Sequence, residues 1–299
     1  EAPAGCKYNS PILAVPKKDA EGHYTKFRFC LDPRLLNDLL EDDNYPLPII
    51  EHVIRAERGF KWITVIDLSD AYWHLPIKKE DQHKTAFTVG ISQYMWTRAP
   101  FGIKTVGSKL QRLMNNVFKD MQGVFVYADD VWIMSTTEND HIKVVREVIS
   151  RLTKAGLRVN WKKFHYFLET AKVLGMIISK DGIKPDPDKI KDIMEWKPPV
   201  NGKAMQSFLG AYNWHRQFLP DFATLCAPLD NLRNVKTITW SETLLLAFNK
   251  LKEALSKQLS LELPNPDQII HLFTDASNVG VGAWLGQESN SSGTDQYVK

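Results

Sequence analysis

Two adjacent aspartates, Asp129 and Asp130, stand between two short apolar runs, residues 124–127 and 131–134. Both runs are of strand length, so they predict a buried β-hairpin with the two acidic side chains at its tip. Burying one unpaired charge is costly, and two like charges side by side cost more. An ordinary two-residue turn contains Asn-Gly or Asp-Gly, but this turn has no glycine, so we expect the strain that is typical of functional sites. The alternative is an exposed, purely structural Asp-rich turn.

A third aspartate, Asp67, ends a β-rich run at residues 62–66. The middle of the chain then predicts a helix, the hairpin, a second helix and a last strand, in the order strand, helix, strand, strand, helix, strand. This order is the split βαβ, or ferredoxin-like, motif, in which the first strand lies beside the hairpin strands. We therefore expect Asp67 beside the hairpin tip. The elements that follow residue 66 are expected at residues 103–121, 124–127, 131–134, 142–156 and 173–179.

Three carboxylates at one edge of a sheet repel one another unless cations neutralise them. The set contains only hard oxygen ligands, with no His or Cys, and this favours Mg²⁺. Two Mg²⁺ ions suit an in-line phosphoryl transfer, in which one activates an attacking 3′-hydroxyl and the other stabilises a leaving pyrophosphate. The sequence therefore predicts a two-metal site at Asp67, Asp129 and Asp130.

The residues after Asp67 fit a nucleotide substrate. Asp70 and Ala71 lie in a turn whose backbone N–H groups can hold a triphosphate, and the ring of Tyr72 could exclude a 2′-hydroxyl. For Tyr72 the alternative is plain packing. Lys17, Lys18 and Arg28 are candidates to bind the triphosphate, and each of them could equally be an ordinary surface charge.

Composition excludes several classes of protein. The net charge is only +3, with 43% hydrophobic residues, which is typical of a globular protein. No apolar run approaches the ~18 residues of a membrane span, and Cys6, Cys30 and Cys226 are too few and too scattered for a disulfide framework or a zinc site. Residues 151–172 hold six Lys or Arg against one Glu, a cluster that suits either a phosphate backbone or a solvated helix face.

Beyond residue 180 the pattern becomes helical. Asp186 with Pro187, Asn201 and Ser241 are expected to cap three successive helices. Residues 264–266 are a Pro-Asn-Pro linker, followed by two β-like runs at residues 269–274 and 279–285.

The motifs together resemble the reverse transcriptase region of gypsy-type (metavirus) LTR retrotransposon Pol polyproteins and, more distantly, the retroviral enzymes. The resemblance runs nearly end to end, and the motifs occur in the family's order. They are Val15-Pro16-Lys17-Lys18, Arg28-Phe29-Cys30-Leu31-Asp32-Pro33-Arg34-Leu35-Leu36-Asn37, Tyr45-Pro46-Leu47-Pro48, Lys84-Thr85-Ala86-Phe87, Pro100-Phe101-Gly102, Tyr127-Ala128-Asp129-Asp130, Leu174-Gly175, Ser207-Phe208-Leu209-Gly210 and Ala227-Pro228-Leu229.

This resemblance implies an α+β right-hand polymerase with fingers, a ferredoxin-like palm, a helical thumb and the start of a ribonuclease H-like domain. The implied divisions are fingers at 1–60 and 75–102, palm at 61–74 and 103–180, thumb at 181–263, and linker with a truncated ribonuclease H-like segment at 264–299. It also implies roles for individual residues. These are Asp67, Asp129 and Asp130 with the Leu68 carbonyl as ligands of two Mg²⁺, Lys17, Lys18, Arg28, Asp70, Ala71, Tyr72 and Phe101 at the nucleotide, Leu174 and Gly175 as primer grip, and Asp275 as a vestigial ribonuclease H metal ligand.

The implied function is an RNA-directed DNA polymerase that extends a primer, and the alternative is a non-catalytic nucleic-acid-binding subunit or a domesticated relic. The implied partners are an RNA or DNA template, a DNA or RNA primer and deoxynucleotides, in a dimer or a larger Pol polyprotein, with no membrane. The expected location is intracellular, in a cytoplasmic virus-like particle with a possible nuclear stage. We expect no ribonuclease H activity, because few residues follow the linker and the other carboxylates of a nuclease site are missing.

Overall fold

The structure is a computed structural model that divides into two compact units. One comprises Glu1–Val53 with Phe60–Leu168, and the other is mainly Glu169–Lys299. Each unit is described by itself below. The residues that the structure describes are 1–18, 23–48, 59–180, 182–219, 221–256, 268–277, 280–288 and 297–298.

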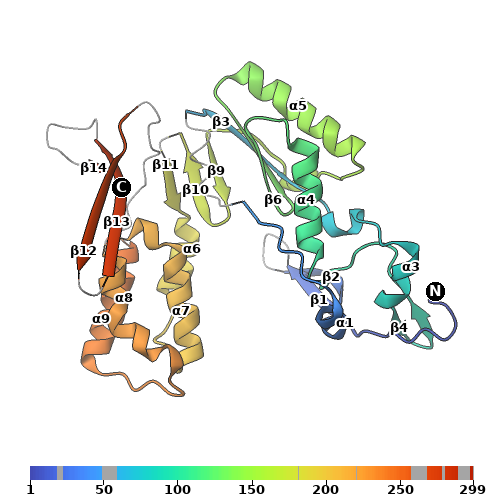
Figure 1. The fold of residues 1–299 in the computed structure, drawn as a ribbon, viewed down its shortest axis with the longest axis horizontal. Helices are drawn as coiled ribbons and strands as arrows, with labels where there is room; N and C mark the ends of the chain where they lie inside the picture. Colours follow the sequence, from blue (N-terminus) through green and yellow to red (C-terminus); the bar gives the residue numbers. More distant parts are fainter. Residues whose placement is uncertain are drawn as a thin grey trace. The chain divides into compact units, whose positions relative to one another are not determined.

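The centre of the first unit is a four-stranded antiparallel sheet (Figure 1). Its strands lie in the order β6 (Val124–Tyr127), β7 (Asp130–Ser135), β3 (Trp62–Asp67) and β8 (His165–Leu168). This order and the helices α4 (Val106–Phe118) and α5 (Glu138–Lys154) are those of the predicted split βαβ motif. The predicted mixed fold with a ferredoxin-like palm is confirmed.

One strand prediction was wrong. The fourth strand of the sheet is β8, which pairs with β3, whereas residues 173–179 do not form one strand. Leu174 and Gly175 have φ angles of 49° and 80°, so the chain reverses there and separates β9 (Thr170–Val173) from β10 (Met176–Ser179). Positive φ in two successive residues is incompatible with an extended strand.

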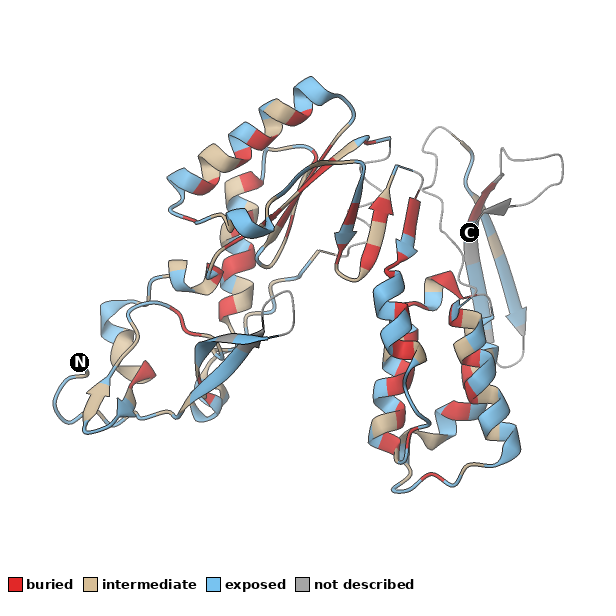
Figure 2. Ribbon diagram, turned by 180° about the vertical axis from the view of Figure 1, so that it is seen from behind, coloured by how far each residue is buried: buried red, intermediate tan, exposed pale blue. Residues whose placement is uncertain are grey.

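The pleat of the sheet separates apolar from acidic side chains. Ile66 of β3 and Val131 and Ile133 of β7 contribute to the core that α4 and α5 cover. Successive strand residues face opposite sides, so Asp67 and Asp130 lie on the side turned away from these helices. Buried residues follow the inner sides of both helices (Figure 2). The two helices bury their apolar faces through Leu110, Met114, Phe118, Val145, Val148 and Leu152.

The rest of the first unit lies at the N-terminal side of α4. Strands β1 (Ile12–Lys18) and β2 (Tyr24–Leu31) form an antiparallel hairpin, in which Val15 lies opposite Arg28. The other elements here are short. They are α1 (Arg34–Leu39), η1 (Ala71–His74), α3 (Lys79–Gln82), η2 (His83–Thr85), β4 (Phe87–Val89) and β5 (Ser92–Tyr94).

The second unit begins with a three-stranded sheet and continues as a helical bundle. The sheet contains β9, β10 and β11 (Gly182–Pro185). The bundle core contains Met205, Phe208, Leu209, Tyr212, Phe248 and Leu251 (Figure 2). The helices are α6 (Pro187–Met194), α7 (Gly202–Trp214), α8 (Phe222–Asp230) and α9 (Glu242–Ser256), with short turns η4 (Arg216–Phe218) and η5 (Asn231–Asn234).

The predicted helix caps are confirmed. The Asp186 side chain accepts a hydrogen bond from the Asp188 N–H, and Pro187 is the first residue of α6. The Asn201 side chain accepts from the Ala204 N–H at 2.9 Å, and the Ser241 hydroxyl accepts from the Leu244 N–H at 3.3 Å. These bonds satisfy N–H groups that have no partner within the helix.

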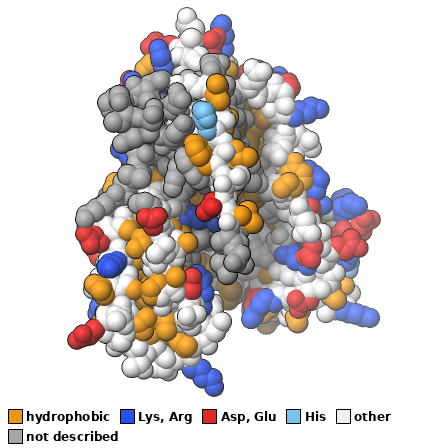
Figure 3. Space-filling view, turned by 60° about the vertical axis from the view of Figure 1, so that its left-hand side comes forward, with side chains coloured by type: hydrophobic (Ala, Val, Ile, Leu, Met, Phe, Trp, Pro, Cys, Tyr) orange, Lys and Arg blue, Asp and Glu red, His pale blue; other side chains and the backbone are white. Residues whose placement is uncertain are grey.

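After the bundle, β12 (His271–Ser277), β13 (Gly280–Glu288) and β14 (Tyr297–Val298) form an antiparallel sheet. Leu272 of β12 lies opposite Leu285 of β13, and both side chains are exposed. Hydrophobic side chains are visible on the face of the molecule that Figure 3 shows. The linker prediction at residues 264–266 lies outside the described residues. Among the described residues, no helix combines the length and apolarity needed to cross a membrane.

Candidate active site

The hairpin tip brings the predicted acidic residues together. Asp67 is the partner of Asp130 across β3 and β7, so their Cα atoms are about 5 Å apart. The backbone N–H of Leu68 donates to the carbonyl oxygen of Asp129 at 3.0 Å. The predicted convergence of Asp67 with Asp129 and Asp130 at one edge of the sheet is therefore confirmed.

The turn between β6 and β7 is strained, as expected. Ala128 has a φ of 53°, a left-handed conformation that costs an L-residue roughly 1 kcal/mol. Ala128 and Asp129 are the two loop residues between the paired Tyr127 and Asp130. Because Asp129 is exposed and Asp130 is only partly buried, the turn presents its carboxylates toward solvent rather than into the core.

The carboxylates interact unfavourably with each other. The pKa of Asp130 is raised to about 6, first by burial and then by the negative charges of Asp129 and Asp67, while Lys163 opposes the increase. The charges of Asp129 and Asp67 therefore lie close enough to Asp130 to disfavour its ionised form, in addition to the larger effect of burial. A divalent cation would remove this penalty, and carboxylate oxygens are the ligands that Mg²⁺ prefers.

Asp67 has two partners that sequence reasoning did not assign to the site. Asn160 Nδ2 donates to Asp67 Oδ1 at 2.9 Å, and Lys163 Nζ lies 2.7 Å from Asp67 Oδ2. Backbone bonds fix this neighbourhood, because the Asn160 N–H donates to the Asp67 carbonyl oxygen and the Ser69 N–H donates to that of Arg158. Among the described residues, no three His, Cys, Asp or Glu side chains are already arranged as a metal-binding group, so Asp67, Asp129 and Asp130 would have to draw together around the ions.

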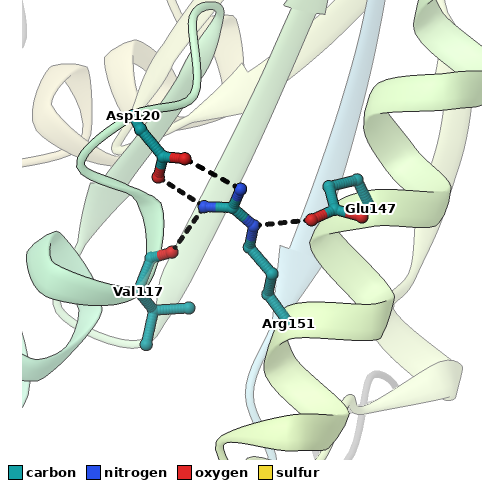
Figure 4. Close-up of polar contacts among 4 residues, drawn as sticks. All are labelled: Val117, Asp120, Glu147 and Arg151. Atoms are coloured by element: carbon teal, nitrogen blue, oxygen red, sulfur yellow. Dashed lines mark hydrogen bonds and ion pairs between the residues drawn. The ribbon is translucent and has the colours of Figure 1, made fainter.

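The basic cluster at residues 151–172 is partly neutralised by carboxylates of the chain itself. Arg151 forms ion pairs with Asp120 and Glu147 and also donates to the Val117 carbonyl oxygen (Figure 4). Lys172 forms ion pairs with Asp186 and Asp188. Three of its six basic residues, Arg151, Lys163 and Lys172, are therefore paired with carboxylates of the chain itself.

A second group of predicted residues gathers beside the hairpin. The rings of Tyr72 and Phe101 lie 5.0 Å apart, and the Arg28 guanidinium lies 4.5 Å from the centre of the Phe101 ring. The pKa of Tyr72 is raised, chiefly by burial and also by the charge of Asp129, whereas Arg28 lowers it. Tyr72, Phe101 and Arg28 come from three separate segments, so only the folded chain brings them to Asp129.

The segment that is predicted to bind the triphosphate follows Asp67 directly. Asp70 has a left-handed φ of 50° and precedes η1, in which Ala71 is buried. Residues 69 and 70 form a turn that leads directly into η1, so the backbone N–H groups of Asp70, Ala71 and Tyr72 follow one another at this point. Lys17 and Lys18 end β1, and their side chains lie outside the described residues.

The remaining predicted residues belong to the second unit. Leu174 and Gly175 form the turn between β9 and β10, where the Gly175 carbonyl oxygen accepts a bond from the Asp186 N–H at 3.0 Å. Asp275 is exposed on β12, opposite Gly282. Their predicted roles as primer grip and vestigial nuclease ligand stay predictions.

Comparison with known proteins now identifies the class of protein. Residues 15–178, just over half of the chain, match the family model "Reverse transcriptase (RNA-dependent DNA polymerase)", and the chain belongs to this family. Residues 240–298 match "RNase H-like domain found in reverse transcriptase". This second match begins before α9, a helix that packs in the core of the bundle.

Among individual proteins, the chain is 35% identical over 300 residues to the retrovirus-related Pol polyprotein from transposon opus of Drosophila melanogaster. It is also 35% identical over 303 residues to that from transposon gypsy of the same organism, and 33% identical over 291 residues to the Tf2-3 polyprotein of Schizosaccharomyces pombe. Each match covers 96% of this chain, but only 30%, 29% and 21% of those proteins, respectively. The resemblance to gypsy-type Pol polyproteins is confirmed.

Solved structures show the same relationship. A foamy viral protease-reverse transcriptase in complex with double-stranded DNA is 26% identical to this chain, with a TM-score of 0.84 over 97% of this chain and 51% of its own. The corresponding protein in complex with an RNA/DNA hybrid is also 26% identical, with a TM-score of 0.78 over 97% of this chain and 39% of its own.

Proposed function

We propose that this chain is an RNA-directed DNA polymerase that adds deoxynucleotides to the 3′-hydroxyl of a primer paired with a template. The observation that carries the proposal is the cross-strand pairing of Asp67 with Asp130, beside the strained turn that presents Asp129. Membership of the reverse transcriptase family supports it. The chain spans less than a third of the length of the Pol polyproteins it matches, so the proposal concerns the polymerase segment alone.

Divalent cations are general in this family, and the donor set suits two Mg²⁺ ions. Asp67, Asp129 and Asp130 would hold them together with the carbonyl oxygen of Leu68, the residue that directly follows Asp67. When bound, the two ions would activate the primer 3′-hydroxyl and neutralise the charge of the leaving pyrophosphate. The raised pKa of Asp130 is consistent with this assignment, because burial and, to a smaller extent, the charges of Asp129 and Asp67 disfavour its ionised form, which a bound cation would stabilise.

The residues beside the carboxylates would bind the incoming nucleotide. Arg28 is positioned over Phe101, where its guanidinium can pair with phosphate oxygens. The backbone N–H groups of Asp70, Ala71 and Tyr72 can donate hydrogen bonds to further phosphate oxygens, and Lys17 and Lys18 are candidates to bind the same triphosphate. Tyr72, half-buried against Phe101, would place its ring against the sugar and exclude a 2′-hydroxyl.

The proposed macromolecular partner is a primer–template duplex, RNA/DNA or DNA/DNA, with a deoxynucleoside triphosphate as the second substrate. The nucleic acids named for the two foamy viral structures support this choice of duplex. We further propose that the chain acts inside cells, within a virus-like particle, as part of a Pol polyprotein or a dimer. The divisions into fingers, palm and thumb stay predictions as given above.

Primer extension tests the proposal. On a poly(rA)/oligo(dT) primer–template with Mg²⁺, we expect incorporation of labelled deoxythymidine triphosphate that EDTA abolishes. Asp129→Asn should remove incorporation while duplex binding, measured by fluorescence anisotropy, is kept. Asp192→Asn, which changes a surface carboxylate of α6, is the matched control and should behave like the wild type. Duplex binding without any incorporation by the wild-type chain would instead identify a non-catalytic nucleic-acid-binding subunit.

A further inference from the structure

Gln111 is a fully buried polar side chain that the proposed chemistry does not use. It lies on the sheet-facing side of α4 with an exposed fraction of 0%, between the apolar residues Leu110 and Met114 of the same core. Burying an amide is costly unless its hydrogen bonds are made. Both polar atoms of the Gln111 side chain, Oε1 and Nε2, form hydrogen bonds, so its burial is compensated.

Two of the bonds end on the catalytic hairpin. Gln111 Oε1 accepts from the backbone N–H of Ala128 at 2.8 Å, and Gln111 Nε2 donates to the carbonyl oxygen of Val126 at 3.0 Å. Val126 belongs to β6, which is an edge strand of the sheet, and Ala128 lies two residues later in the turn that follows β6. A carbonyl at one residue and an N–H two residues later are the two groups that the N–H and C=O of one residue in a parallel neighbouring strand would bind. The side-chain amide therefore takes the place of a missing strand at the end of β6.

The amide acts on the residue that carries the strain. Ala128, with its φ of 53°, directly precedes Asp129. An alanine gains nothing from this conformation by itself, and glycine is the residue that adopts it without cost. The Gln111 side chain, which is already bound to the Val126 carbonyl, accepts from the Ala128 N–H. This hydrogen bond offsets the conformational cost only while Ala128 keeps its positive φ.

A second layer fixes the amide itself. Gln111 Nε2 also donates to Asn115 Oδ1 at 2.9 Å, and Asn115 Nδ2 donates to the Tyr45 hydroxyl oxygen at 2.9 Å. Arg112 lies over the Tyr45 ring, 4.3 Å from its centre, and pairs with Asp43. The rotamer of Gln111 is thus set by a chain of bonds that reaches the segment containing Asp43 and Tyr45.

We propose that Gln111 is a positioning residue of the polymerase site, which holds the turn at Ala128 and thereby places Asp129. Only an amide serves here, because the Ala128 N–H needs an acceptor and the Val126 carbonyl needs a donor. A carboxylate would lack the donor, and an apolar side chain would leave both backbone groups unbonded. The kinetic part of this inference rests on the proposed polymerase function, whereas its structural part does not.

The structural part is tested by amide hydrogen exchange, followed by NMR on the whole chain. In the wild type the Ala128 amide should be protected, and in Gln111→Met its exchange should speed up at least tenfold, since it loses its acceptor. Asn116→Met introduces the same side chain at an exposed position of α4 and should leave the Ala128 amide unchanged. If Gln111→Met does not fold, Asn115→Ala is the second variant. It keeps both bonds from Gln111 to the hairpin but removes the bond that fixes the Gln111 side chain, so the Ala128 amide should exchange about threefold faster.

The kinetic part is tested by a split of kcat from KM. Gln111→Met should lower kcat for nucleotide incorporation about tenfold or more, with KM for the nucleotide changed less than about threefold, because Asp129 is misplaced while the nucleotide contacts persist. Adding Ala128→Gly should restore at least about threefold of the lost kcat, since glycine adopts positive φ without help. A role in packing alone would not be rescued at residue 128.

The outcomes are decisive. An Ala128 amide equally protected in Gln111→Met and wild type would overturn the proposed contact. An unchanged kcat, or no rescue by Ala128→Gly, would overturn the positioning role. If the wild-type chain incorporates no nucleotide at all, the proposed function fails, and the exchange experiment still decides whether Gln111 holds the turn.

Discussion

Lys163 places its ammonium nitrogen 2.7 Å from Asp67 Oδ2 and so supplies a positive charge at the edge of the proposed metal site. The lysine side chain is 58% exposed, so this is a solvent-screened pair, whereas only 16% of the Asp67 side chain is exposed. A lysine at this position competes with any other cation for the Asp67 carboxylate. The positive charge of Lys163 is therefore expected to lower the affinity of the site for Mg²⁺.

We predict that Lys163→Met binds Mg²⁺ more tightly. Losing an exposed ion pair of about 0.5–1 kcal/mol makes Asp67 more available, which corresponds to an apparent Kd about two- to fivefold lower at low ionic strength. Isothermal titration of the chain with Mg²⁺ measures the change, and Lys162→Met, at the exposed neighbouring residue, is the control. Equal affinities for wild type and Lys163→Met would show that the lysine does not compete with the ion.

Asp130→Asn should stabilise the protein in EDTA. A carboxyl group with a folded pKa raised to about 6 binds more protons when folded than when unfolded, so its contribution to stability falls as the pH rises from about 4 to about 6. At pH 8 the variant no longer carries this penalty, which solvent screening reduces to about 1–2 kcal/mol, or a few degrees in Tm.

Adding Mg²⁺ should reverse the order of the two proteins. The ion raises the Tm of a chain only through the ligands that bind it, so wild type should gain more than Asp130→Asn. Differential scanning fluorimetry at pH 8, with EDTA and then with Mg²⁺, measures both effects, and Asp192→Asn is the control. A variant less stable than wild type in EDTA would contradict the electrostatic account of the site.

Tyr72→Ala should admit ribonucleotides. Removing the ring that packs 5.0 Å from Phe101 opens space where a 2′-hydroxyl would lie. We expect the preference for deoxynucleotides, expressed as the ratio of kcat/KM values, to fall by on the order of ten- to a hundredfold. Single-nucleotide incorporation with matched deoxy- and ribonucleoside triphosphates measures it, and Tyr94→Ala serves as control. An unchanged ratio would assign Tyr72 to packing.

His141 should make the first unit sensitive to acid. Its Nε2 lies 2.7 Å from Thr64 Oγ1, and its Nδ1 lies 3.0 Å from Ser135 Oγ. Because Thr64 Oγ1 also accepts from the Phe167 N–H, its own proton is free to bind Nε2, and the ring is held neutral. Burial lowers the pKa of His141 to about 4.

The unfolded chain binds a proton at this residue below pH ~6.5, whereas the folded chain does so only near pH 4, so stability falls as the pH drops between these values. Between pH 7.5 and 5 the loss from His141 amounts to about 2 kcal/mol. Urea unfolding at both pH values measures this loss of unfolding free energy in wild type and in His141→Gln. Subtracting one from the other cancels contributions that both proteins share, such as that of His215. The exposed His165→Gln should lose stability with acid as wild type does.

Local sequence patterns predicted the elements of the fold and the identity of the acidic residues. Apolar runs of strand length on both sides of Asp129 and Asp130, helical spacing in α4 and α5, and caps such as Asn201 depend on residues within a few positions of each other. For that reason these features can be predicted from the sequence without the tertiary structure. The ferredoxin-like order of elements then placed Asp67 beside the hairpin, which the register of β3 and β7 confirms.

Contacts between distant segments were decided only by tertiary structure. The fourth strand of the sheet is β8 rather than residues 173–179, because pairing with β3 selects it and the turn at Leu174 excludes the later run. In the sequence, Lys163 is only one of several charges in a basic cluster. The fold places it beside Asp67, from which it is 96 residues away in the chain. Gln111 did leave a sequence signal, as a polar residue three positions before Met114 and seven before Phe118 on the buried side of α4. The role of Gln111 depends on which backbone groups its side chain can reach, here those of Val126 and Ala128. Only the packing of α4 against the sheet determines this.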